Sequence, residues 1–212
     1  MQKTARCTIM KRRNLFPAVF FALLVAAESF RIQDRANQTT DIRAFLNTSE
    51  LIWTTNTTAV IRHVCKVDRL EPIAEKNVTF YRSYYEKPGW SIAKYIGIFK
   101  HYFNVTPKEP YDSMDVTTTR GRHTVTETLH YQSPNNDCAV FWILGTYGYS
   151  LQPWYEMRMT HSRIKLGFTY EDECWKALVG AAHKKIRRVY DPRCQKVLAK
   201  YPSPANLNDS HY

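Results

Sequence analysis

Histidine and cysteine are the side chains of this chain best suited to act as nucleophiles, bases or metal ligands, and their spacing argues against catalysis. None of the 7 histidines stands in a motif that activates a serine or cysteine nucleophile. The sequence has no Gly-x-Ser-x-Gly turn and no glycine-rich phosphate loop. It also lacks Cys-x-x-Cys and His-x-x-x-His spacings, which are typical of metal sites. We therefore expect a binding protein without metal or cofactor rather than an enzyme.

The N-terminal residues show a targeting pattern. Residues 1–13 carry five basic side chains and no acid, and residues 15–27 (LFPAVFFALLVAA) are uncharged. A membrane span needs about 20 apolar residues, so this shorter run predicts a secretory signal peptide over residues 1–27. Cleavage after Ala27 or after Ser29 fits the small residues at its end. An uncleaved signal anchor is the alternative interpretation.

Removal of this segment changes the meaning of the net charge. The whole chain has 30 Lys+Arg and 19 Asp+Glu, a formal charge of +11, and losing five basic residues leaves 25 minus 19, or +6. A strongly basic chain invites a nucleic-acid interpretation. Because a secreted domain rarely meets nucleic acid, we expect no nucleic-acid partner and no stable membrane insertion.

The cysteines and the Asn-x-Ser/Thr sequons agree with secretion. Cys7 lies in the signal segment, which leaves four cysteines for the mature chain. An even number predicts two disulfides, and four cysteines allow three pairings. The six sequons that predict glycosylation are those at Asn37, Asn47, Asn56, Asn77, Asn104 and Asn208.

The mature chain is predicted to consist mainly of β-strands. Its 14 Tyr, 10 Phe and 5 Trp argue against disorder and favour sheet. An amphipathic helix is expected from the cap Asp41 onwards, with Ile42, Phe45 and Leu46 on its apolar face. A basic-ended helix is expected over Glu171–Tyr190. The strands are expected at 51–55, 59–67, 77–85, 90–103, 114–119, 124–131, 138–144 and 154–164.

Eight strands at hairpin spacing can avoid open edges by closing into a barrel. The predicted domain organisation is a signal peptide at 1–27, a flexible segment at 28–40, a barrel with its C-terminal helix at 41–198, and a disordered tail at 199–212. No internal repeat and no second domain is expected.

Several short motifs occur in a characteristic order along these strands. They are Cys65 early in the second strand, Asp137-Cys138-Ala139-Val140-Phe141 opening a late strand, Tyr155-Glu156-Met157-Arg158-Met159 in the last strand, Cys174 near the start of the C-terminal helix, and Cys194 just beyond it. In this order, over roughly residues 41–196, the chain resembles a lipocalin. More specifically, it resembles the divergent tick salivary lipocalins related to histamine-binding proteins.

The resemblance implies a mainly β fold. This is an eight-stranded antiparallel up-and-down lipocalin barrel, with a short N-terminal helix and a C-terminal helix packed on it. It implies the disulfides Cys65–Cys194 and Cys138–Cys174. It also implies a secreted protein, expected to be a monomer, that sequesters a small host mediator at a feeding site.

The choice of ligand depends on the last strand. Glu156 matches the glutamate of the family motif, whereas Arg158 stands where the family usually has tryptophan. An inward Arg158 favours a ligand with a carboxylate, since charge-assisted hydrogen bonds contribute about 1.5–3 kcal/mol. Phe141, Tyr84 and Leu129 would then surround an acyl chain. The expected ligand is an anionic lipid such as a leukotriene, a thromboxane or a fatty acid.

Several alternatives remain open at this stage. Arg158 could pair internally with Glu156 or Glu127 and take no part in binding, or this face of the strand could point to solvent. Glu156 and Glu127 could instead hold a biogenic amine such as histamine or serotonin. A protein of a different class would inhibit host complement or haemostasis through its outer loops, with the barrel empty.

Two further segments have competing interpretations. Tyr81–Trp90 is rich in aromatic residues, and cross-strand aromatic pairs explain it more simply than a platform for stacking a ligand. Lys184–Arg188 is expected to be the solvated end of a helix rather than a site for anionic surfaces.

Overall fold

The computed structural model describes residues 40–199, apart from 105, 107, 120, 122–124, 148–149 and 168. The predicted signal peptide with Cys7, nearly all of the predicted flexible segment and tail, and the sequons at Asn37 and Asn208 lie outside the described residues. Among the helices of the described part, none is long and apolar enough to span a membrane.

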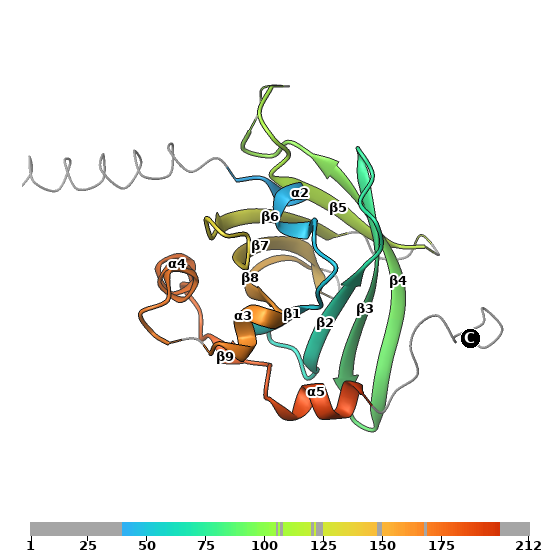
Figure 1. The fold of residues 1–212 in the computed structure, drawn as a ribbon, viewed down its shortest axis with the longest axis vertical. Coiled ribbons are helices and arrows are strands. Elements are labelled where there is room, and N and C mark those ends of the chain that lie inside the picture. The colour runs from blue at the N-terminus through green and yellow to red at the C-terminus, as the bar shows by residue number, and fades with distance from the viewer. Residues whose placement is uncertain are drawn as a thin grey trace, which may run out of the picture. The chain divides into compact units, whose positions relative to one another are not determined.

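Eight antiparallel strands follow one another around a closed barrel (Figure 1). Strand β1 pairs with β8 and also with β2, and this double pairing closes the sheet. The predicted up-and-down barrel is therefore confirmed. The strands are β1 (Ile52–Thr57), β2 (Val64–Leu70), β3 (Asn77–Glu86), β4 (Gly89–Lys100), β5 (Ser113–Thr118), β6 (Val125–Gln132), β7 (Cys138–Tyr147) and β8 (Ser150–Thr160).

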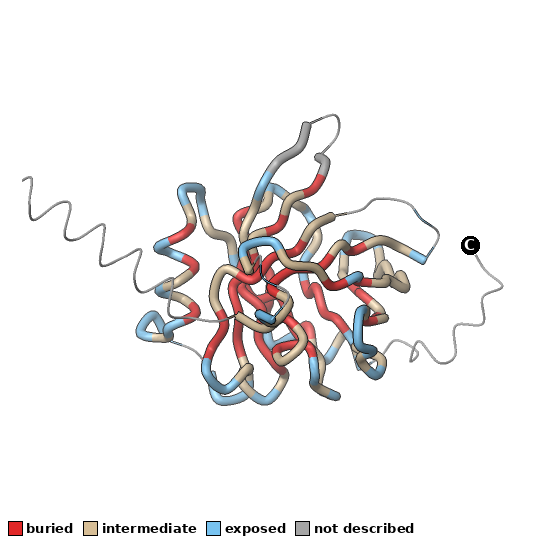
Figure 2. Tube along the Cα trace, turned by 90° about the horizontal axis from the view of Figure 1, so that it is seen from above, coloured by how far each residue is buried: buried red, intermediate tan, exposed pale blue. Residues whose placement is uncertain are grey.

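Helix α2 (Ile42–Leu46) seals one end of the barrel. The Asp41 carboxylate caps it by accepting hydrogen bonds from the backbone N–H groups of Arg43 (2.9 Å) and Ala44 (3.2 Å). Ile42 and Phe45 are fully buried in the main apolar cluster with residues of β3 to β7. The expected helix and its cap are confirmed. Figure 2 shows the buried residues gathered toward the middle of the described part.

Two predicted strands end earlier than expected because side-chain oxygens accept hydrogen bonds from backbone N–H groups in the residues that follow. The strand expected over 90–103 ends at Lys100, where β4 ends. The Asp112 carboxylate accepts hydrogen bonds from the backbone N–H groups of Tyr102, Phe103 and Asn104. The strand expected over 154–164 ends at Thr160. The hydroxyl of this threonine caps helix α3 (His161–Lys165), which the sequence did not predict.

The strand expected over 59–67 begins later than predicted, because β2 starts at Val64. Residues 58–63 form a connection whose carbonyl groups bond to a side chain instead of a neighbouring strand. The Arg187 guanidinium donates to the carbonyl oxygens of Ala59 and Ile61, both at 2.6 Å. This connection and the C-terminal part of the chain therefore hold one another in place.

The helix expected over 171–190 is wrong in its second half. Helix α4 (Glu173–Ala181) is followed by an extended segment containing the short strand β9 (Arg187–Arg188), so Lys184–Arg188 is not a helix end. The Val189 N–H donates to the Thr55 carbonyl (2.9 Å), and the Val189 carbonyl accepts from the Cys65 N–H (2.8 Å). The extended segment therefore fills the space where β1 and β2 diverge. Pairing with both strands favours an extended backbone over a helix.

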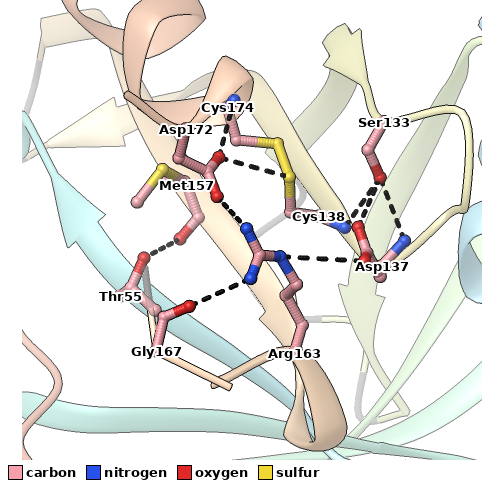
Figure 3. The surroundings of a disulfide bond; sticks show 9 residues. All are labelled: Thr55, Ser133, Asp137, Cys138, Met157, Arg163, Gly167, Asp172 and Cys174. Atoms are coloured by element: carbon pink, nitrogen blue, oxygen red, sulfur yellow. Dashed lines mark hydrogen bonds and ion pairs between the residues drawn. A yellow bond between two sulfur atoms is a disulfide. The ribbon is translucent and has the colours of Figure 1, made fainter. Parts of the chain in front are cut away.

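Two disulfides hold the C-terminal elements against the barrel. Cys194 lies within a further helix, α5 (Arg193–Leu198), rather than beyond the last helix as expected. It bonds to Cys65 of β2 across 129 residues. Cys138 at the start of β7 bonds to Cys174 of α4 (Figure 3). These are the pairs that the resemblance implied.

The four described sequons differ in accessibility. Asn47 is exposed and Asn77 is partly exposed at the start of β3. The Asn104 amide nitrogen donates to the carbonyl oxygens of Thr40 and Pro110. Asn56 is only 5% exposed within β1, so the folded barrel leaves no room for a glycan at this predicted site.

Removal of the long-range disulfide should strongly destabilise the protein. In the chain-entropy model, closing a loop of this length contributes about 4–5 kcal/mol. We expect the C65A/C194A variant to lose a free energy of unfolding of that order in urea denaturation under non-reducing conditions. A loss smaller than about 1 kcal/mol would contradict the prediction that this disulfide makes a large contribution to stability.

Candidate functional site

Six charged side chains meet inside the barrel. They comprise three cations and three carboxylates, so their formal charges cancel. Their side chains are between 1 and 8% exposed. They are Lys66 and Asp68 of β2, Arg82 of β3, Glu127 of β6, and Glu156 and Arg158 of β8. We call this set the charge network.

One half of the charge network is built around Arg82. Its guanidinium grips Asp68 as a fork, with Nε–Oδ1 and Nη2–Oδ2 distances of 2.8 Å. Its Nη1 donates to Glu127 Oε1 at 2.7 Å. The same guanidinium lies over the rings of Phe80 (5.0 Å) and Tyr95 (5.5 Å). Arg82 therefore joins β2 and β6 across the lumen.

The other half is built around Arg158. Its Nη1 donates to Glu127 Oε2 at 2.6 Å and its Nη2 donates to Glu156 Oε2 at 2.7 Å. The guanidinium lies over the Phe141 ring at 4.4 Å. Lys66 Nζ donates to both oxygens of Glu156, at 2.8 and 2.7 Å. The contacts thus run in the order Asp68, Arg82, Glu127, Arg158, Glu156 and Lys66, beginning and ending on β2.

Strand periodicity places these groups together. Residues two apart on a strand share a face, so Lys66 and Asp68 both point inward, as do Glu156 and Arg158. Asp68 and Arg82 are direct partners in the β2–β3 register. The alternate residues of β2 and β8, including Cys65, Val67, Met157 and Met159, face the helices and the C-terminal segment outside.

The charge network keeps its carboxylates ionised in spite of burial. Burial raises the pKa of Glu156, but Lys66 and Arg158 outweigh it and bring this pKa to about 2. Burial likewise opposes ionisation of Glu127, and Arg158 with Arg82 hold its pKa well below the ordinary range. Burial and the nearby Arg82 lower the pKa of Lys66 to about 8.

An apolar layer lies on one side of the charge network and an aromatic layer on the other. Toward α2, the interior is filled by residues such as Phe80, Leu129 and Phe141. Toward the β3–β4 turn, the chain places half-buried aromatic residues. The rings of His63 and Tyr84 lie 4.5 Å apart, and Trp154 Nε1 donates to Glu156 Oε1 at 3.3 Å. Burial and the charge of Lys66 lower the pKa of His63 to about 4, so this ring is neutral at pH 7.

The structure brings together four of the six predicted ligand-binding residues. Arg158, Glu156, Glu127 and Phe141 lie in direct contact in the lumen. Leu129 belongs to the apolar layer and Tyr84 to the aromatic layer. The solvent-facing alternative for Arg158 is wrong, because its side chain is 1% exposed. Arg158 is paired internally, and contact with a ligand stays a prediction.

Sequence reasoning missed Lys66, Asp68 and Arg82. The signal that could have found them is the alternation of Lys66 and Asp68 with Cys65 and Val67, which places the charges on the face opposite the disulfide. Arg82 lies within the aromatic-rich segment Tyr81–Trp90, whose pattern indicated only aromatic pairing.

That aromatic segment forms cross-strand pairs, as expected. Tyr85 and Trp90 are partners within it in the β3–β4 register, and Phe80 and Tyr95 form a further pair just beyond its bounds. Their ring centroids lie 6.1 Å and 5.6 Å apart, respectively.

Breaking the charge network should be costly. Replacing Arg158 by Met leaves Glu127 and Glu156 buried with one cation fewer. The loss of one partner from a buried ion pair typically costs about 3–5 kcal/mol. We expect R158M to lose unfolding free energy of that order in urea denaturation. The control R193M removes an arginine from an exposed pair with Asp191 and should change little.

The free energy of unfolding should also depend on pH, because Glu156 is ionised in the folded protein. Its folded pKa of about 2 lies below the ordinary value of 4.5, so it contributes stability that is fully present above pH 4.5 and is lost as the pH falls toward 2. We expect the free energy of unfolding to fall over this range in the wild type and to fall less steeply in E156Q, where Glu127 still contributes its own share because its pKa is also lowered. The exposed E171Q serves as the control and should keep the wild-type slope. An unchanged slope in E156Q would contradict this assignment.

Comparisons with known proteins give distant likenesses only. No family model matches the chain, and no curated protein matches it. Among solved structures, Japanin from Rhipicephalus appendiculatus bound to cholesterol is 11% identical, over 70% of this chain and 97% of that one, with a TM-score of 0.46. A mutant of LTBP1 in complex with leukotriene C4 is 11% identical, over 71% and 87%, with a TM-score of 0.46. Lobster apocrustacyanin A1 is 9% identical, over 76% and 85%, with a TM-score of 0.46. The fold is therefore assigned from the strand order of the barrel and not from these comparisons.

Proposed function

We propose that this protein is a secreted lipocalin that binds a small amphipathic molecule in its barrel, with the anionic group of the ligand on Lys66. The observation that carries the proposal is the uneven pairing of the three internal cations. Arg82 contacts Asp68 and Glu127, and Arg158 contacts Glu127, Glu156 and, at 3.9 Å, Asp68. Within the part of the chain that the structure describes, Lys66 is ion-paired with Glu156 alone, at the end of the charge network. It is the cation with most to gain from a further anion.

The surroundings of Lys66 favour an anion over an amine. Lys66 and His63 both have lowered pKa values, at about 8 and about 4, because burial and neighbouring cations disfavour added positive charge there. Glu127 and Glu156 are each already paired with two cations. An amine would have to compete with these cations for the same oxygens. We therefore prefer an anionic lipid, such as a leukotriene, thromboxane or fatty acid, to histamine or serotonin.

This proposal transfers the predicted anchoring role from Arg158 to Lys66. Arg158 lies in the middle of the charge network, is hydrogen-bonded to Glu127 and Glu156, and is also ion-paired with Asp68. It would act on a ligand only through Glu156. The half-buried rings of Tyr84 and Trp154 lie on the Lys66 side and would contact the apolar part of the ligand.

The biological setting is inferred from the sequence pattern and the disulfides. Disulfides persist mainly in oxidising compartments, and the N-terminal pattern is typical of a signal peptide. The resemblance to tick salivary lipocalins then suggests that the protein sequesters a host mediator. Glycans would be carried at exposed sequons such as Asn47.

Calorimetry with arachidonate tests the role of Lys66. A charge-assisted pair contributes enough for at least a tenfold change in affinity. We expect K66M to weaken arachidonate binding by about that factor and to leave binding of the uncharged arachidonyl alcohol unchanged. Wild-type affinity for arachidonate should fall as the pH rises above about 8, where Lys66 loses its proton, and K66M should lack this dependence.

The exposed K108M removes a lysine far from the interior and is the matched control. Binding of histamine or serotonin in preference to arachidonate would contradict the anionic proposal. Failure of all these ligands to bind would favour an inhibitor that acts on a host protein.

A further inference from the structure

A cavity lies outside the barrel, between β1 and the elements that follow β8. Its volume is about 660 Å³, and its lining comes from β1, α3 and the turn after it, α4, β9 and α5. We call it the outer groove. It shares no lining residue with the charge network, so it is a separate candidate site.

The floor of the outer groove contains an unsatisfied polar atom. Asn56 lines the groove and is 5% exposed, and its Oδ1 has no hydrogen-bond partner among the described residues. It lies in the irregular part of β1, where its Cα is paired with Met157 on one side and Arg188 on the other. A buried acceptor without a partner is uncommon in folded proteins. A ligand with an N–H or O–H donor would satisfy it.

The walls of the groove are aromatic and its rim is cationic. Trp175, Tyr170 and Tyr190 line the walls, and the rings of Tyr170 and Trp175 meet edge to face at 5.4 Å. Lys165 and Arg188 also line the groove and are exposed. None of the described lining residues carries a carboxylate. The groove thus offers flat apolar walls and two exposed cations at its rim.

The framework around the groove is held rigidly. Arg163 of α3 donates to the carbonyl of Gly167 in the groove at 2.9 Å, and it is ion-paired with Asp172 and Asp137 (Figure 3). The Cys138–Cys174 disulfide fixes α4 beside the same residues. A preformed groove loses less free energy on binding than one that must first be ordered.

We propose that the outer groove binds a small aromatic acid that carries an N–H or O–H donor. The aromatic ring lies against Trp175 and Tyr190, the donor reaches Asn56 Oδ1, and the anionic group stays at the rim with Lys165 and Arg188. This site is independent of the ligand in the barrel.

Three related probes test each part of the proposal on the purified protein. Indole-3-acetate has the ring, the N–H group and the anion. Naphthalene-1-acetate lacks the N–H group, and tryptamine replaces the anion by a cation. By calorimetry we expect indole-3-acetate to bind, naphthalene-1-acetate to bind about fivefold more weakly, and tryptamine to bind about tenfold more weakly or not at all.

Variants locate the bound probe. K165Q/R188Q should weaken indole-3-acetate binding by about tenfold, while R69Q/K108Q, which removes two exposed cations elsewhere, should leave it unchanged. N56L should abolish the preference for indole over naphthalene. K66M should have no effect on indole-3-acetate, which separates this site from the barrel.

The proposal is overturned if indole-3-acetate does not bind or if the three probes bind equally. It is also overturned if K66M, rather than K165Q/R188Q, removes binding, because the probe would then occupy the barrel.

Discussion

The alternating contacts of the charge network are the constraint on which the interior of this barrel depends. Moving isolated charges out of water is very unfavourable, and pairing offsets this only when the geometry is good and the hydrogen bonds are satisfied. Here each carboxylate contacts at least one cation, and the network joins β2, β3, β6 and β8. The strands must therefore keep one register, since a shift by one residue would turn the charges outward.

The rest of the interior is arranged around this polar layer. On one side, α2 and the apolar layer exclude water. This exclusion strengthens the ion pairs of the charge network beside them. On the other side, the aromatic layer leaves Lys66 as the last cation of the network, with a single carboxylate. The formal charges of the interior therefore cancel within the protein, while Lys66 has fewer carboxylate partners than either arginine.

The fold could be predicted from the sequence much better than the site. Periodicity and turn residues located the strands, and Asp41 located the first helix, because these signals are local. The end of β4 depends on Asp112, and the extended course of residues 187–190 depends on β1 and β2, both distant in sequence. The charge network depends on the register of four strands at once. Sequence alone identified Glu127, Glu156 and Arg158 as candidate binding residues. It did not identify the other members of the charge network, with which these three form ion pairs.

The segment at residues 187–190 has a consequence for the order in which this protein folds. Because Val189 bonds to Thr55 and to Cys65, the wall between β1 and β2 is incomplete until this late part of the chain has been synthesised. The Cys65–Cys194 disulfide joins the helix that follows this segment to β2. A chain that ended before β9 would lack the segment that fills the gap between β1 and β2, and Thr55 and Cys65 would lose these hydrogen bonds.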